Sequence, residues 1–141
     1  MAPGFMPIPT IRVVAAALFD SRGRVLIAQR PPGTHMAGRW EFPGGKIDAG
    51  ESELEALRRE LKEELGVALQ DAERLLELSH EYPERRIELC MWHVTRYSGE
   101  PQSLDGQSLK WVDPAELERE DLLEADRPIV AALKGFARSS A

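Results

Sequence analysis

The stretch "GGKIDAGESELEALRRELKEELG", residues 44–66, opens with paired glycines and continues with a helical repeat. Four leucines recur at the spacing of one helical face: Leu54, Leu57, Leu61 and Leu65. This repeat predicts a helix over residues 52–65, and Gly66 stands where a glycine commonly ends one. The same stretch carries seven acidic residues, whose mutual repulsion calls for a compensating positive partner.

Three of these acids share one side of the expected helix. Glu60, Glu63 and Glu64 stand at i, i+3 and i+4, so they fall within an arc of about 100° beside the leucine stripe. Oxygen ligands without a nearby cysteine or histidine indicate Mg²⁺ or Mn²⁺ rather than Zn²⁺, and Mg²⁺ is often shared with substrate phosphates. The alternative is a solvated helix face, on which neighbouring basic residues neutralise the acids. The glycines before the helix favour the cation site, since they let backbone carbonyls approach a metal.

The composition is that of one globular domain. The chain has 141 residues, of which 43% are hydrophobic and 30% charged. Its net charge of -6 argues against a general binder of nucleic-acid polymers or membrane surfaces, because both partners are polyanionic. No apolar run is long enough to span a bilayer and no leader peptide is evident, so we expect a cytoplasmic protein. Cys90 lies in the apolar run "IELCMWHV" and is expected to be a buried thiol.

Residues 1–10 contain three prolines and are expected to form a flexible arm before a single domain over residues 11–138. Strands are expected in five apolar runs: residues 11–19, 24–30, 74–82, 86–97 and 108–112. The first two are expected to pair as a hairpin through the turn "DSRG", and the next two as a second hairpin. "DPAELE" supplies a helix-capping aspartate, and "DRPIVAALKGF" predicts a closing helix with Pro128 near its start. Strands interleaved with helices indicate an α/β or α+β sandwich with a mixed sheet.

A longer pattern runs through the opening stretch: Gly45, five residues, Glu51, seven residues, Arg59-Glu60-Leu61, one residue, Glu63-Glu64, one residue, Gly66-Val67. It matches every fixed position of the Nudix box, so the chain resembles the Nudix hydrolase superfamily. The resemblance implies an α/β Nudix fold, with a mixed β-sheet in an α/β/α sandwich. It also implies metal-dependent hydrolysis of a nucleoside diphosphate linked to another moiety.

The resemblance assigns roles within the box. It implies that Glu60, Glu63 and Glu64 are catalytic metal ligands, joined by the backbone carbonyl of Gly44. It further implies that Glu51 and Arg59 form a structural ion pair bracing the loop on the helix. The expected cofactor is Mg²⁺ or Mn²⁺, which neutralises charge on phosphate oxygens and activates a bound water.

Beyond the box, residues 11–133 resemble the MutT subgroup, whose members remove oxidised purine nucleoside triphosphates from the nucleotide pool and so protect DNA. The similar segments are "THMAGRWEFPGGKI", "EYPERRI", "DGQSLKW" and "PAEL". By this resemblance Arg30 contacts the nucleotide, Phe42 walls the base pocket, Arg85 closes over it and Lys46 meets phosphate. The plain alternatives are a surface arginine, a core phenylalanine and a loop charge, respectively, for the first three. The implied reaction attacks the β-phosphorus and releases a nucleoside monophosphate and pyrophosphate.

Two positions depart from the MutT pattern. Asp105 stands where that subgroup has a late glutamate that binds metal and is a proposed general base, so the general base is either Asp105 or Glu60. Asp126 stands where the subgroup has an asparagine that reads the oxidised purine. An amide offers both a donor and an acceptor, whereas an ionised carboxylate only accepts. The second substrate hypothesis is therefore a pyrimidine nucleotide such as CTP or 5-methyl-dCTP.

Other readings of the sequence are weaker. A non-catalytic nucleotide-binding Nudix module would typically lack some of the box glutamates, all of which are present here. Neither an alternating Ca²⁺ loop nor the spacings of zinc, serine or cysteine hydrolases occur. His35 is expected to anchor its loop, and His80 and His93 to be structural. The oligomer is expected to be a monomer or a homodimer.

Overall fold

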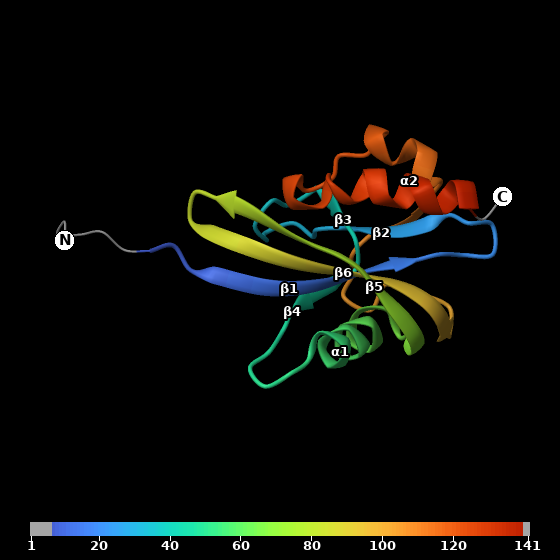
Figure 1. Cartoon of the computed structure of the whole chain (residues 1–141), viewed down its shortest axis with the longest axis horizontal. Coiled ribbons are helices and arrows are strands. Elements are labelled where there is room, and N and C mark those ends of the chain that lie inside the picture. The colour runs from blue at the N-terminus through green and yellow to red at the C-terminus, as the bar shows by residue number, and fades with distance from the viewer. Residues whose placement is uncertain (1–6, 140–141) are drawn as a thin grey trace.

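The computed structural model describes the backbone of residues 7–139 and the side chains of residues 7–135. Its strands form two sheets (Figure 1). The four-stranded sheet has the order β4 (Gly44–Lys46), β1 (Thr10–Leu18), β6 (Arg85–Ser98), β5 (Ala68–Tyr82). The three-stranded sheet has the order β3 (Trp40–Glu41), β2 (Val25–Gln29), β7 (Leu109–Val112). The helices are α1 (Glu53–Leu65) and α2 (Ile129–Ser139), with 3₁₀ turns η1 (Pro114–Arg119) and η2 (Glu124–Asp126).

Strand directions confirm the expected mixed α/β fold. β1 runs parallel to β6 and antiparallel to β4, while β5 and β6 form the second expected hairpin. That hairpin is longer than predicted, because β5 begins at Ala68 rather than at residue 74. Two of its irregularities lie between Leu69 and Ala72, in the part of the strand that the prediction left out.

The first expected hairpin is wrong in its pairing. β1 and β2 meet only at an isolated bridge between Phe19 and Val25, and β2 instead pairs with β3 and β7. The predicted turn between them does form, since Asp20 accepts hydrogen bonds from the backbone N–H groups of Arg22 and Arg24. β1 is buried on both faces from Val14 to Leu18, so it lies inside a sheet between two strands from distant parts of the chain.

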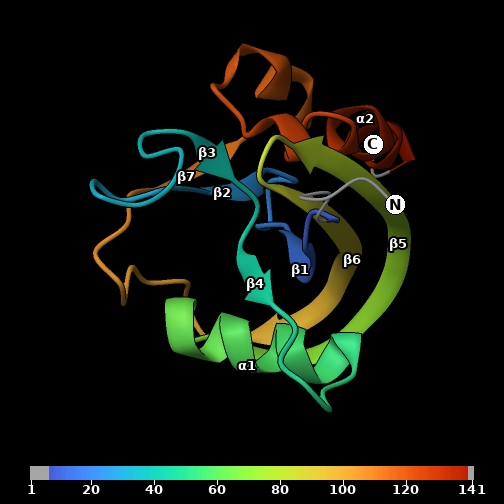
Figure 2. The same cartoon turned by 90° about the vertical axis from the view of Figure 1, so that its left-hand side faces the viewer.

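Helices cover the strands on opposite sides (Figures 1 and 2). On one side, α1 packs its leucine stripe against β1, where Val14 and Leu18 are buried. On the other side, α2 and η1 close a second core around Met91. The residues of this second cluster from the C-terminal third are Val112, Leu117, Leu122, Ile129, Val130 and Leu133.

Both ends of α1 are fixed by local hydrogen bonds, which confirms the helix predicted over residues 52–65. The Ser52 hydroxyl accepts from the N–H of Glu55 at 3.1 Å, and the Glu55 carboxylate accepts from the N–H of Ser52 at 2.9 Å. Gly66 ends the helix in the left-handed conformation, with φ of 69°, and its N–H bonds to helix carbonyls.

The other local expectations can also be located. Asp113 caps η1 by accepting from the N–H of Ala115, and α2 begins directly after Pro128. Cys90 is fully buried, as predicted. Residues 1–6 of the expected arm lie outside the described residues, and Thr10 already belongs to β1. No helix in the described part of the chain combines the length and apolarity needed to cross a bilayer.

Candidate active site

The glycine turn before α1 lies in tight contact with both the sheet and the helix. A Cβ on Gly44 would come within 1.9 Å of the carbonyl oxygen of Val14, and a Cβ on Gly45 within 2.5 Å of the carboxyl carbon of Glu60. At Gly44 the clash is with backbone, so only glycine fits there, whereas a Cβ at Gly45 would displace the Glu60 carboxylate. The turn thus places the backbone of β4 directly against the carboxylate of Glu60.

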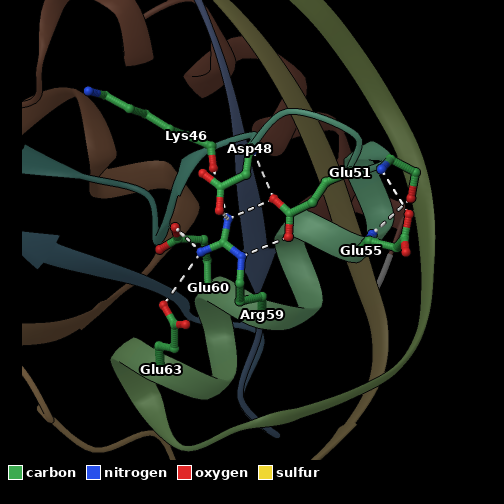
Figure 3. Close-up of polar contacts among 8 residues, drawn as sticks. Lys46, Asp48, Glu51, Glu55, Arg59, Glu60 and Glu63 are labelled. Atoms are coloured by element: carbon green, nitrogen blue, oxygen red, sulfur yellow. Dashed lines mark hydrogen bonds and ion pairs between the residues drawn. The ribbon is translucent and has the colours of Figure 1, made fainter.

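Arg59 lies at the centre of a polar network that joins this turn to α1 (Figure 3). Its Nε and Nη2 donate to the two carboxylate oxygens of Glu51, both at 2.8 Å. Nη2 also donates to the carbonyl of Lys46 at 3.1 Å, and Nη1 donates to Glu60 at 2.8 Å. The two hydrogen bonds from Arg59 and one from the Asp48 N–H lower the pKa of Glu51 to about 2. The structure thus brings together Glu51 and Arg59, the two residues expected to form the structural pair.

Two of the three expected metal ligands lie close together. Burial is the largest cause raising the pKa of Glu64, and the negative charge of Glu60 is the next. Glu63 instead points outward: its side chain is 61% exposed, and its carboxylate accepts from Arg59 at 3.4 Å (Figure 3). Within the described residues, no three His, Cys, Asp or Glu side chains converge as a ready metal-binding group. The crowded pair still fits a cation, because a positive ion would relieve the repulsion between Glu60 and Glu64.

A cavity of about 320 Å³ opens beside these carboxylates. Its volume lies at the small end of the range for ligand pockets. All five of the expected substrate-binding residues line it: Arg30, Phe42, Lys46, Arg85 and Asp126. Gly44, Gly45 and Glu64 line the same cavity, so it is continuous from the expected base wall to the expected metal ligands. The Lys46 side chain extends away from the Arg59 network (Figure 3).

Asp126 is the only polar or charged residue among the buried residues that the structure describes, with 6% of its surface exposed. Its Oδ2 accepts a hydrogen bond from the N–H of Phe42 at 2.9 Å. Burial raises the pKa of Asp126 to about 7, and the nearby carboxylate of Glu41 adds to the increase. Near neutral pH this carboxyl is therefore partly protonated, and a protonated carboxyl can donate as well as accept.

A second, smaller cavity of about 190 Å³ lies on the other side of Glu64. Asp105 lines it together with Gln107, whose side-chain oxygen accepts from the N–H of Asp105 at 3.0 Å. The charge of Asp105 contributes to the raised pKa of Glu64, which places the two carboxylates within electrostatic reach. Asp105 is itself exposed, on the loop before β7.

Glu41 and Tyr82 are among the residues of the main cavity that the sequence did not single out. Glu41 directly precedes Phe42, and Tyr82 is the second residue of the segment "EYPERRI", which also contains Arg85. Their closeness in sequence to residues already assigned to the site is the signal that could have identified them. The Tyr82 hydroxyl accepts from the N–H of Ala125 at 3.3 Å, which ties the hairpin to the turn that carries Asp126.

The histidines have the supporting positions expected of them. The carbonyl of His35 accepts from Arg30, and its ring meets the ring of Tyr82 edge-on. His80 packs on Tyr82 and lies 3.5 Å from Glu124. His93 contacts Phe19, and burial lowers its pKa.

Comparison with known proteins gives consistent matches. The family model described as a NUDIX domain matches residues 14–132. The 8-oxo-dGTP diphosphatase of Escherichia coli (strain K12) is 36% identical over 124 residues, which cover 88% of this chain and 96% of that protein. The CTP pyrophosphohydrolase of the same strain is 40% identical over 119 residues, which cover 84% and 88%.

Solved structures agree with the sequence matches. One from a study of MutT from Aliivibrio salmonicida and Vibrio cholerae has a TM-score of 0.77 at 33% identity, covering 88% of this chain and 96% of that chain. The solution structure of the E. coli ORF135 protein has a TM-score of 0.80 at 39% identity, covering 91% of each chain.

Proposed function

Because this chain belongs to the Nudix hydrolase family, we propose that it is a nucleoside triphosphate pyrophosphohydrolase whose substrate is 8-oxo-dGTP or a related oxidised purine nucleotide. In the proposed reaction, water attacks the β-phosphorus and the oxygen bridging to the α-phosphorus leaves with the nucleoside monophosphate. The attacking water's oxygen is retained in the released pyrophosphate. The continuous cavity from Asp126 to Glu64 carries this proposal, since it matches a nucleotide that extends from base to phosphates.

Nudix hydrolases generally need a divalent metal, and we propose Mg²⁺ or Mn²⁺ for this one. The residues that would hold it are Glu60, Glu64 and the carbonyl of Gly44, with Glu63 after release from Arg59. A divalent metal held by these residues would supply charge neutralisation at the phosphate oxygens and a lower pKa for the attacking water. The chain's own contribution is a crowded, partly buried set of acids that favours a cation, held in place by the Arg59 network.

Two carboxylates are candidates to accept the proton of that water. Asp105 lines the smaller cavity with Glu64 and lies on the exposed loop before β7. Glu60 lies against the glycine turn, with its side chain only 14% exposed. A general base must lie within hydrogen-bonding reach of the water, directly or through a second water.

The identity of the nucleobase depends on Phe42 and Asp126, which line the main cavity and are joined by a hydrogen bond. A partly protonated Asp126 offers a donor and an acceptor, as an asparagine does, and that supports an oxidised purine. A CTP or 5-methyl-dCTP substrate is the second candidate. Two observations favour it: the carboxyl itself, and the 40% identity to a CTP pyrophosphohydrolase.

The decisive experiment compares kcat/KM for 8-oxo-dGTP, dGTP, CTP and 5-methyl-dCTP with Mg²⁺, with and without a chelator, and identifies the phosphate product. We expect pyrophosphate release that the chelator abolishes and a preference for 8-oxo-dGTP; a preference for either pyrimidine would establish the second candidate. Glu64→Gln should lower kcat by about a hundredfold or more, the scale on which one lost electrostatic group slows an enzyme. The exposed Glu73→Gln is the matched control and should leave kcat unchanged. Release of orthophosphate instead would contradict the proposal.

A further inference from the structure

An ion pair that the proposed reaction has not used lies in the wall shared by the two cavities. Glu41 ends β3 and Arg30 follows β2, and the antiparallel pairing of these strands brings the two side chains together. Nη1 of Arg30 donates to both carboxylate oxygens of Glu41, at 2.8 and 3.3 Å. The two side chains are only 24% and 28% exposed, so solvent screens the pair less than it screens a surface salt bridge.

The guanidinium of Arg30 is held from a second direction as well. Its Nε donates to the carbonyl of His35 at 2.5 Å. Two of the three guanidinium nitrogens are therefore bound to protein, and Nη2 makes no hydrogen bond to any residue that the structure describes. A planar group fixed at two points presents its third nitrogen in a defined direction, with little further loss of conformational freedom on binding.

Glu41 lies within electrostatic reach of residues assigned to two different functions. The charge of Glu41 raises the pKa of both Asp126 and Glu64, and the charge of Arg30 lowers that of Asp126. Glu41 is therefore within reach of the proposed base-reading residue and of a proposed metal ligand. Arg30 and Glu41 line both cavities, which places them where a nucleotide would pass from its base to its phosphates.

We propose that Glu41 is a positioning residue that holds Arg30 so that Nη2 donates to an oxygen acceptor of the bound nucleotide. This inference rests on the proposed function, because it assigns a contact within the same cavity. In this role Glu41 acts through Arg30 rather than through a contact of its own with the substrate. Without the carboxylate, the arginine is left as a partly buried charge lacking its partner and is no longer fixed at two points.

Glu41→Gln is the main test, since it keeps the size and one oxygen acceptor but removes the charge. We expect KM to rise about tenfold, on the scale of one charge-assisted hydrogen bond, with kcat changed by less than about twofold. Arg30→Gln should raise KM at least as much. The double variant should be no worse than Arg30→Gln alone, because Glu41 has nothing to position once the guanidinium is gone. Glu116→Gln removes an exposed carboxylate paired with Arg119 and should change neither constant.

Equilibrium binding of α,β-methylene-dGTP, measured by calorimetry, gives a readout that does not depend on turnover. Its Kd should show the same increase and the same lack of additivity. If Glu41→Gln fails to fold by circular dichroism, Glu41→Asp serves as the second variant; it keeps the charge but withdraws the carboxylate by one carbon, and should weaken binding similarly.

The results distinguish failure of the positioning role of Glu41 from failure of the proposed hydrolase function. An unchanged KM and Kd in a folded Glu41→Gln protein, or additive effects in the double variant, would overturn the positioning role while the hydrolase proposal stands. A wild-type protein that neither releases pyrophosphate nor binds the analogue would overturn both.

Discussion

Asp126→Asn should stabilise the protein, and the gain should grow with pH. In the folded state the raised pKa of Asp126, about 7 against the ordinary 3.8, means that ionisation is unfavourable. The stability contributed by the protonated form is fully present below pH 3.8 and is lost as pH rises through about 7. At about 1.4 kcal/mol per pKa unit, the full penalty above pH 7 is at most about 4 kcal/mol. Asparagine is uncharged at every pH and its side-chain oxygen can still accept from Phe42.

The assay is urea denaturation of both proteins at about pH 5.5 and about pH 8.5, followed by circular dichroism. The gain should be about 2 kcal/mol at the lower pH, where the folded carboxyl stays protonated, and about 4 kcal/mol at the higher. Asp71→Asn is the control, since Asp71 is 59% exposed and should give a small change with no comparable increase. An equal gain for Asp126→Asn at both pH values would refute the reasoning, because it would mean that Asp126 does not titrate in this interval.

Two further predictions concern the glycine turn and its network. Gly45→Ala would place a methyl group within 2.5 Å of the Glu60 carboxyl carbon, so kcat should fall about tenfold or more because the Glu60 side chain is misplaced. Gly135→Ala in α2 is the control: the added Cβ meets nothing within 4 Å, so kcat should not change. The pKa of Glu51, lowered to about 2 from 4.5, gives stability that is present above pH 4.5 and is lost as pH falls towards 2. Measured against pH, the free energy of unfolding should show this loss in the wild type and a smaller loss in Glu51→Gln. Parallel curves for the two proteins would contradict the prediction.

Features set by residues near in sequence were predictable. The α1 boundaries follow from Ser52, the leucine repeat and Gly66, all within one short segment. The pairing of β1 was not predictable in the same way, because its partners β4 and β6 lie far along the chain and its own apolar run does not indicate which strands flank it. A turn such as "DSRG" suggests a hairpin, yet it serves equally well where the chain passes from one sheet to another.

The same distinction applies to the candidate site. The box acids could be placed on one helix face because their spacing is local, and the structure brings Glu60 and Glu64 together there. Glu41 could not be singled out, because its environment is created by Arg30 from another strand and by charges from α1 and η2. Glu63 shows a different limit: its i, i+4 spacing from Arg59 permits the observed contact, but spacing does not decide between that contact and a place beside Glu60 and Glu64.

The capping box at Ser52 and the left-handed Gly66 together fix the rotational phase of α1. Each residue added between the cap and Glu60 would turn the acids by about 100° relative to the β4 backbone, whatever residue it was. Side chains on the outer face of this helix can therefore vary freely, but its length between the two caps cannot. The geometry of the candidate site therefore depends on the number of residues between the caps as much as on their identity.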